Sequence, residues 1–339
     1  MYIVVTGAAG FIGFHVAKKL LGEGYKVIGI DNINNYYDTG IKFARLNILQ
    51  NQQNFIFLKC DIDQYDELNK GLDGFEVEGI IHLAAQAGVR YSIENPFEYT
   101  KSNLTGFTSI LEIAKSHKIN HLVYASTSSV YGANKNLPFA EKNIADHPIQ
   151  FYAATKRANE LMAHSYSSLF SIPTTGLRFF TVYGPWGRPD MALFKFTKNI
   201  LAGEEINVFN NGNHHRDFTY IDDIVDGILK AFNSPPAPDI NWDSYNPVPD
   251  SSFAPFKIYN IGNGKPITLM KYIELIEKYL NKKAKIKYLP LQPGDVVNTA
   301  SNITSISANL EYKPLIDVSV GVKNFVDWYL DFYKENNDA

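Results

Sequence analysis

Six short apolar runs, each followed by a helical or polar stretch, constrain the fold of this chain most strongly. The runs cover residues 2–5, 26–30, 54–60, 79–85, 121–127 and 174–182. Helical patterns lie between them at 11–22, 97–117 and 151–170. The runs are continuously apolar, whereas strands with one wet face alternate between apolar and polar residues. The sequence therefore predicts an α/β fold: a doubly wound parallel sheet of the Rossmann type, covered by helices on both faces.

The pattern changes after about residue 183, where the Pro/Gly-rich segment "YGPWGRPDM" begins. Residues 234–255 carry too many prolines for a regular element and are expected to form a surface loop. Between these segments, 217–233 has strand and helix character and is expected to return to the first domain. The predicted larger domain is 1–182 plus about 217–233 and 257–262. The predicted smaller, mostly C-terminal domain is about 183–216 and 263–339.

Composition argues against several classes of partner. The net charge of −3 gives no electrostatic reason to expect nucleic acid or an anionic membrane. No apolar run approaches membrane-spanning length. Cys60 is the single cysteine, which excludes an internal disulfide, and the eight histidines show no metal-ligand spacing. Because the chain starts with a strand-like run, we expect no signal peptide and a cytoplasmic protein without a metal.

Gly7, Gly10 and Gly13 lie directly between the first run and the first helical stretch. Glycines at this spacing allow a tight turn and let a pyrophosphate approach the positive end of the helix. Asp31 ends the second run, where a carboxylate can bond both ribose hydroxyls and repel a 2′-phosphate. Asn32 follows it, not a basic residue. The pattern predicts a dinucleotide site and favours NAD over NADP.

Further cofactor contacts are expected from residues that share the carboxyl edge of the predicted sheet, where ligands bind in such folds. Two begin the first helix and the others follow the third and fourth runs. These residues are Phe11, Ile12, Asp61, Ile62, Leu83, Ala84 and Ala85.

Tyr152 and Lys156 are four residues apart at the start of a helical stretch and so share one helical face. Such pairs also arise by chance, but this one shortly follows the fifth run, which ends in four consecutive hydroxyl residues, 126–129. A phenol that accepts a proton near neutral pH must lower its pKa by roughly 3 units, about 4 kcal/mol. One cation about 5 Å away supplies roughly 3 kcal/mol at an effective dielectric of 20. Lys156 together with a nicotinamide ring could therefore activate Tyr152 as a base.

Together these residues resemble the extended short-chain dehydrogenase/reductase family of NAD-dependent nucleotide-sugar epimerases and dehydratases, over essentially the whole chain. The resemblance implies that Thr127 completes a catalytic triad with Tyr152 and Lys156. Dehydratases of the family follow this Thr with an Asp-Glu pair. Here the two positions are Ser128 and Ser129, which argues against elimination of water.

Four longer stretches are similar to the UDP-glucuronate 4-epimerases of this family: 82–96, 151–167, 177–197 and 216–225. The resemblance implies that bound NAD oxidises C4 of the sugar, that the ketosugar rotates, and that hydride returns to the other face. Tyr152 would act first as base and then as acid, and NAD would stay bound between turnovers. The larger domain would bind NAD and the smaller one the UDP-sugar, for polysaccharide biosynthesis.

The same resemblance suggests roles for polar residues around the sugar. Thr127, Ser128, Ser129 and Thr181 would bind the six-position carboxylate. Neutral donors suit a carboxylate that must swing, because an arginine fork would anchor it strongly. Other expected contacts are Arg216 with the diphosphate, Arg188 with the nucleotide sugar, Asp295 with the uridine ribose or its adjoining loop, and Asn103 near the cofactor. Arg90 is expected either to bind the nucleotide sugar or to form a structural salt bridge.

Other functions remain open at this point. A 4-epimerase for UDP-glucose or UDP-N-acetylglucosamine would differ only in the six-position pocket. A UDP-glucuronate decarboxylase begins with the same oxidation and releases carbon dioxide. A catalytically inactive NAD-binding regulator is the non-enzymatic alternative. Residues 97–117 and 151–170 resemble the helix pair through which the family dimerises, so the resemblance also implies a homodimer.

Overall fold

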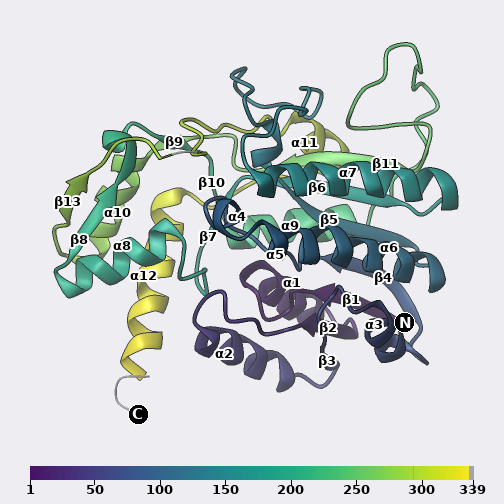
Figure 1. Cartoon of the computed structure of the whole chain (residues 1–339). Coiled ribbons are helices and arrows are strands. Elements are labelled where there is room, and N and C mark those ends of the chain that lie inside the picture. Colours follow the sequence, from purple (N-terminus) through teal and green to yellow (C-terminus); the bar gives the residue numbers. More distant parts are fainter. Residues whose placement is uncertain (293, 336–339) are drawn as a thin grey trace.

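The computed structural model describes residues 1–292 and 294–335 and is built on one parallel sheet (Figure 1). Its seven strands run in the order β11-β6-β5-β4-β1-β2-β3. They are β1 (Tyr2–Thr6), β2 (Val27–Asp31), β3 (Phe55–Lys59), β4 (Val77–His82), β5 (His121–Thr127), β6 (Thr174–Phe179) and β11 (Phe256–Ile261). The predicted doubly wound fold is confirmed, and each apolar run supplies a strand.

Helices cover both faces of this sheet, which explains why its strands are apolar throughout. One face packs against α1 (Phe11–Gly22), α2 (Thr39–Gln50) and α9 (Ile221–Phe232). The other packs against α3 (Tyr65–Leu72), α6 (Gly106–Ser116) and α7 (Phe151–Phe170). Val4 and Val5, adjacent in β1, are both buried, one against each layer.

The helix expected at 97–117 is interrupted. Short helices α4 (Tyr91–Glu94) and α5 (Pro96–Tyr99) precede a π-helical turn η1 (Thr100–Thr105), which leads into α6. The buried side chain of Asn103 lies in this wider turn and bonds to residues outside it. The π-helical turn therefore coincides with the tertiary contacts of Asn103, and the helical pattern of the sequence does not indicate it.

The smaller layer lies beyond the carboxyl ends of the strands (Figure 1). Its elements are β7 (Thr181–Tyr183), α8 (Ala192–Ala202), β8 (Glu205–Val208), η3 (Phe209–Gly212), β9 (His215–Arg216), β10 (Phe218–Tyr220), β12 (Ile267–Thr268), α10 (Leu269–Leu280), β13 (Lys285–Tyr288) and α12 (Val318–Glu335). The helix α11 (Thr304–Leu310) lies instead on the main sheet, against β11 and α9. Buried rings of Phe194, Tyr272 and Phe325 join α8, α10 and α12 to the main core. Residues 234–255 form no helix and expose Ile240 and Tyr245 almost fully.

The described residues contain neither a membrane-spanning helix nor a cluster of metal ligands. Among those residues no helix has the length and apolar character needed to cross a bilayer. Within the same ranges, no group of three or more His, Cys, Asp or Glu residues could hold a metal ion.

Candidate active site

A cleft of about 880 Å³ runs along the carboxyl edge of the sheet, between the glycine loop and the smaller layer. Parallel α/β sheets bind ligands at this edge. The cleft brings together the predicted residues except Asn103. They are Gly7, Gly10, Phe11, Ile12, Gly13, Asp31, Asn32, Asp61, Ile62, Leu83, Ala84, Ala85, Arg90, Thr127, Ser128, Ser129, Tyr152, Lys156, Thr181, Arg188, Arg216 and Asp295.

The glycine loop presents bare backbone at the start of α1. Gly7 has φ of +71°, which favours glycine. A Cβ on Gly13 would lie 2.1 Å from the carbonyl oxygen of Gly7, and one on Gly10 would lie 2.9 Å from it. Gly10 caps α1 without a side-chain hydrogen bond, and the first turn has no acidic residue. A diphosphate fits this unblocked helix N-terminus.

Asp31 is buried at the end of β2 and accepts hydrogen bonds from the backbone of Ala9 (3.0 Å) and Ile33 (2.8 Å). Burial raises the pKa of the carboxyl group, against the lowering effect of these bonds and of Lys42. Lys42, which the sequence analysis did not identify, also lines the cleft. Its ammonium donates to Asn34, and burial lowers its pKa to about 8.

Asn103 lies behind the cleft wall instead of lining it. Its amide donates to the carbonyl of Gln86 (3.1 Å) and to the Thr155 hydroxyl (3.0 Å), and its oxygen accepts from the Gln86 backbone (2.8 Å). The side chain therefore joins the loop after β4 to α7. The expected cofactor role of Asn103 becomes one of holding Gln86, which does line the cleft.

Tyr152 and Lys156 reach the cleft from the first turns of α7. Lys156 is 1% exposed, and its ammonium donates no hydrogen bond to any residue that the structure describes. Burial lowers the pKa of Lys156 to about 8. Burial raises the pKa of Tyr152, whereas the Arg188 charge and a hydrogen bond with Thr127 lower it. An unpaired ammonium on the wall fits the hydroxyls of a ribose.

The row of hydroxyls after β5 divides into two groups. Ser126 also borders the cleft, but its hydroxyl donates to the buried carboxylate of Glu160 (2.6 Å), which pairs with Arg178 at 2.8 Å. Ser128 and Ser129 line the cleft, and their hydroxyls have no hydrogen bond to any described residue. The hydroxyl of Ser126 is therefore committed to a bond within the protein, whereas those of Ser128 and Ser129 are available to a ligand.

The guanidinium of Arg216 also faces the cleft without an anionic partner. It donates to the carbonyl oxygens of His215 (3.2 Å), Val297 (2.6 Å) and Val296. No carboxylate among the described residues lies within ion-pair distance of it. Burial lowers the pKa of Arg216 to about 10, although the charge of Asp295 raises it. This environment suits a phosphate, which would supply the missing charge.

The two other predicted arginines are paired with carboxylates. Arg188 bonds to Asp190 through both Nε and a terminal nitrogen. Arg90 pairs with Asp295 at 2.9 Å and lies over the ring of Phe209 at 4.6 Å. The salt bridge that the sequence left open for Arg90 is therefore present, and it joins the two sides of the cleft.

Comparison with known proteins is consistent with this geometry. The profile described as "Epimerase: NAD dependent epimerase/dehydratase family" matches residues 3–262. Protein CapI of Staphylococcus aureus is 52% identical, over 99% of this chain and all of that protein. A probable UDP-glucuronate 4-epimerase of Rhizobium meliloti is 47% identical, over 98% of both. The crystal structure of UDP-glucuronic acid 4-epimerase from Bacillus cereus, in complex with UDP-glucuronic acid and NAD, superposes with a TM-score of 0.88 at 33% identity, covering 98% of this chain and 100% of that one.

Proposed function

Because this chain belongs to the NAD dependent epimerase/dehydratase family, we propose that it interconverts UDP-glucuronate and UDP-galacturonate at C4, using bound NAD. One observation carries the choice of sugar. Ser128 and Ser129 present uncommitted hydroxyls at the end of β5, where family dehydratases carry an acidic pair. Hydroxyl donors at this position suit the six-position carboxylate of a uronic acid.

The residues of the cleft fit a dinucleotide. The backbone of Gly10 and Gly13 would receive its diphosphate, Asp31 its adenosine ribose, and Lys156 its nicotinamide ribose. NAD supplies reversible oxidation of the sugar carbon when it is bound.

Tyr152 is the proton-transfer group of the proposed reaction. Its phenolic oxygen accepts the proton of the C4 hydroxyl and later returns one to the oxygen on the other face. Burial disfavours both the phenolate of Tyr152 and the ammonium of Lys156 when each is charged alone. Opposite charges in one buried site stabilise each other, so the phenolate forms most readily while Lys156 is protonated. Thr127, which lowers the pKa of Tyr152, would hold the tyrosine oxygen.

Two sets of donors would hold the nucleotide sugar during its rotation. Arg216 binds the diphosphate, which stays in place. Thr127, Ser128, Ser129 and Thr181 bind the carboxylate, which must be released and bound again. Neutral hydroxyl donors allow this release, because each bond to them is weaker than a bidentate arginine pair.

We also propose that two copies of the chain associate through α6 and α7, as the family resemblance implies, and that the enzyme is cytoplasmic. In support, α7 exposes Leu161 (58%) and Leu169 (69%), which lie eight residues and about 80° apart around the helix. Replacing Leu161 with Glu should convert a dimer into a monomer in light scattering after size-exclusion chromatography. A monomeric wild-type protein would refute this proposal.

Turnover by the purified protein without added NAD tests the main proposal. UDP-glucuronate and UDP-glucose are supplied separately, and products are resolved by anion-exchange chromatography or NMR. UDP-galacturonate from the first substrate alone supports bound NAD and carboxylate selection together. Turnover of UDP-glucose instead would identify a UDP-hexose 4-epimerase, and a UDP-pentose with carbon dioxide would identify a decarboxylase. Absence of product even after NAD is restored would favour the regulator.

A further inference from the structure

The chain makes an unusual turn directly before Arg188. Trp186 has φ of +61°, a left-handed conformation that bulky residues adopt only where their surroundings hold it. Gly187 and Arg188 follow, and Arg188 lines the cleft. Asp190 holds the guanidinium of Arg188, and the backbone from which this side chain extends is placed by the turn.

Two side chains, from α1 and α2 beside the predicted cofactor site, donate hydrogen bonds to three consecutive carbonyl groups of this turn. His15 of α1 donates to the carbonyl of Pro185 (3.0 Å). Arg45 of α2 donates through one terminal nitrogen to the carbonyls of Trp186 (2.6 Å) and Gly187 (3.3 Å). Within the described residues, these are the hydrogen bonds that reach the backbone of 185–187 from other segments.

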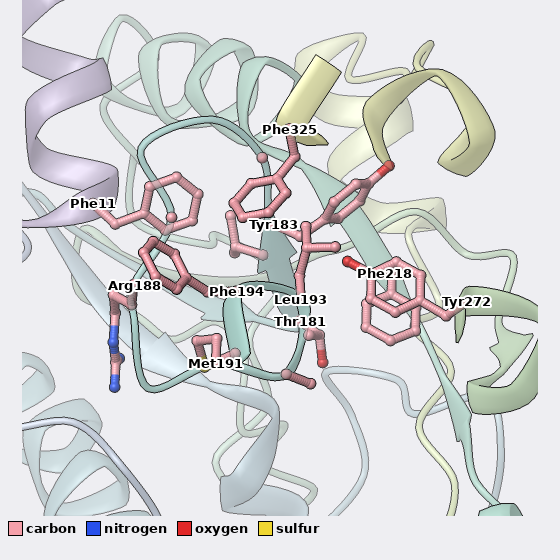
Figure 2. A pocket seen from close by; sticks show the side chains of 14 residues that line it. Phe11, Thr181, Tyr183, Arg188, Met191, Leu193, Phe194, Phe218, Tyr272 and Phe325 are labelled. Atoms are coloured by element: carbon pink, nitrogen blue, oxygen red, sulfur yellow. The ribbon is translucent and has the colours of Figure 1, made fainter. Parts of the chain in front are cut away.

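The other contacts around this loop are largely apolar. Figure 2 shows a small cavity, of about 30 Å³, surrounded by side chains that include Phe11, Leu193, Phe194 and Phe325, with Arg188 extending away from these rings. The apolar rings can support the loop by packing, but they offer its carbonyl groups no donors. The hydrogen bonds that fix the direction of the turn therefore come from His15 and Arg45.

Arg45 also contacts the cofactor loop. Its second terminal nitrogen donates to the carbonyl of Ala9 (2.9 Å), between Gly7 and Gly10, and to the Tyr37 hydroxyl (3.0 Å). Arg45 is fully buried, and no carboxylate among the described residues pairs with it within ion-pair distance. One rigid guanidinium thus bonds both the glycine loop and the turn before Arg188.

We propose that Arg45 is a positioning residue that sets the glycine loop and Arg188 in register, so that cofactor binding and placement of the nucleotide sugar are coupled. This inference rests on the proposed function, because it assigns the cleft to a dinucleotide and a UDP-sugar. Arg45 reaches neither ligand and acts through the backbone of Ala9 and Trp186.

The test compares four proteins: wild type, Arg45→Lys, Arg188→Ala and the double variant. Lysine keeps the charge, but its compact ammonium cannot reproduce the planar fork that bonds both loops. We expect Arg45→Lys to raise KM for UDP-glucuronate about tenfold or more, with a smaller change in kcat, because a misplaced binding group has effects of that size. In the Arg188→Ala background, the same replacement should change KM little, since the two residues act as a unit.

His15→Leu, which removes the donor to Pro185, provides a second, independent variant should Arg45→Lys fold poorly. His15 holds the same turn through Pro185 but does not touch the glycine loop. We expect it to raise KM for UDP-glucuronate while the protein purifies with as much NAD as wild type, whereas Arg45→Lys should retain less. Arg157→Lys, which alters a partly exposed arginine on α7, is the matched control and should leave NAD content unchanged.

Independent, multiplicative effects of Arg45→Lys and Arg188→Ala on KM would overturn the inference. So would variants at Arg45 and His15 that lower only the melting temperature and leave KM and NAD content at wild-type values. Wild-type protein without UDP-sugar turnover would instead count against the proposed function, so the two failures are distinguishable.

Discussion

Replacing Ser128 or Ser129 with Ala should shift the choice of sugar without harming the fold. Both hydroxyls line the cleft and have no hydrogen bond to a described residue, so their removal leaves no protein group unpaired. We expect the free energy of unfolding to change by less than about 0.5 kcal/mol.

The size of the shift follows from the charge of the ligand. A hydrogen bond to a carboxylate contributes about 1.5–3 kcal/mol, whereas one between neutral groups contributes about 0.5–1.5 kcal/mol. UDP-glucuronate has a carboxylate at the sixth carbon and UDP-glucose has a hydroxyl. Each replacement should therefore cost the uronic acid about 1–1.5 kcal/mol more, and lower its preference in kcat/KM about 5- to 13-fold.

Ser126 in the same row is the matched control. Its hydroxyl donates to the buried Glu160, so Ser126→Ala should lower the free energy of unfolding by about 1–3 kcal/mol. The ratio of kcat/KM between the two sugars should not change. The assay is initial-rate epimerisation of both substrates by each variant, with thermal unfolding alongside. Unchanged ratios for Ser128→Ala and Ser129→Ala, or an equal shift for Ser126→Ala, would refute the reasoning.

Further predictions concern proton transfer, phosphate binding and acid stability. Tyr152→Phe should lower kcat about 10²- to 10⁴-fold while NAD stays bound, as measured by initial rates and by cofactor content after denaturation. Arg216→Ala should raise KM for both UDP-sugars about 10- to 150-fold and leave NAD content unchanged, because it removes a charge-assisted contact from the nucleotide only; an effect confined to one sugar would contradict this. Burial lowers the pKa of His15 and of His121 to about 4, so the unfolded chain binds more protons between pH 6.5 and 4. The melting temperature should therefore fall as pH drops through this window, less steeply in His121→Gln; parallel curves for the two proteins would exclude His121 as a source.

Sheet strands were the most predictable part of this fold. Each is continuously apolar because both of its faces are covered, and that property is local enough to read from the sequence. The π-helical turn at 100–105 was not predictable, because Asn103 bonds to Gln86 and Thr155, which are distant in sequence. Such contacts alter the backbone of the helix without leaving a trace in the apolar pattern of the sequence.

Which residues line the cleft was also predictable, because parallel strands bring their carboxyl ends to one edge of the sheet. Pairings between side chains were not. The salt bridge of Arg90 with Asp295 and the bond of Ser126 to Glu160 join segments far apart in the chain. The roles of Arg45 and Lys42 were not predictable either. A basic residue on an amphipathic helix is usually solvated, whereas here both side chains are buried.

The edge strand β11 has a consequence for how the chain is made. It pairs with β6, yet residues 180–255 are synthesised between the two. At 5–20 residues per second, the ribosome needs roughly 4 to 16 s to complete this interval and β11 itself. Throughout that time the nascent sheet has an open edge with unpaired backbone groups, which favours pairing with other chains. The rate of translation across this stretch, and the chaperones present there, should therefore influence how much of the protein reaches its native state.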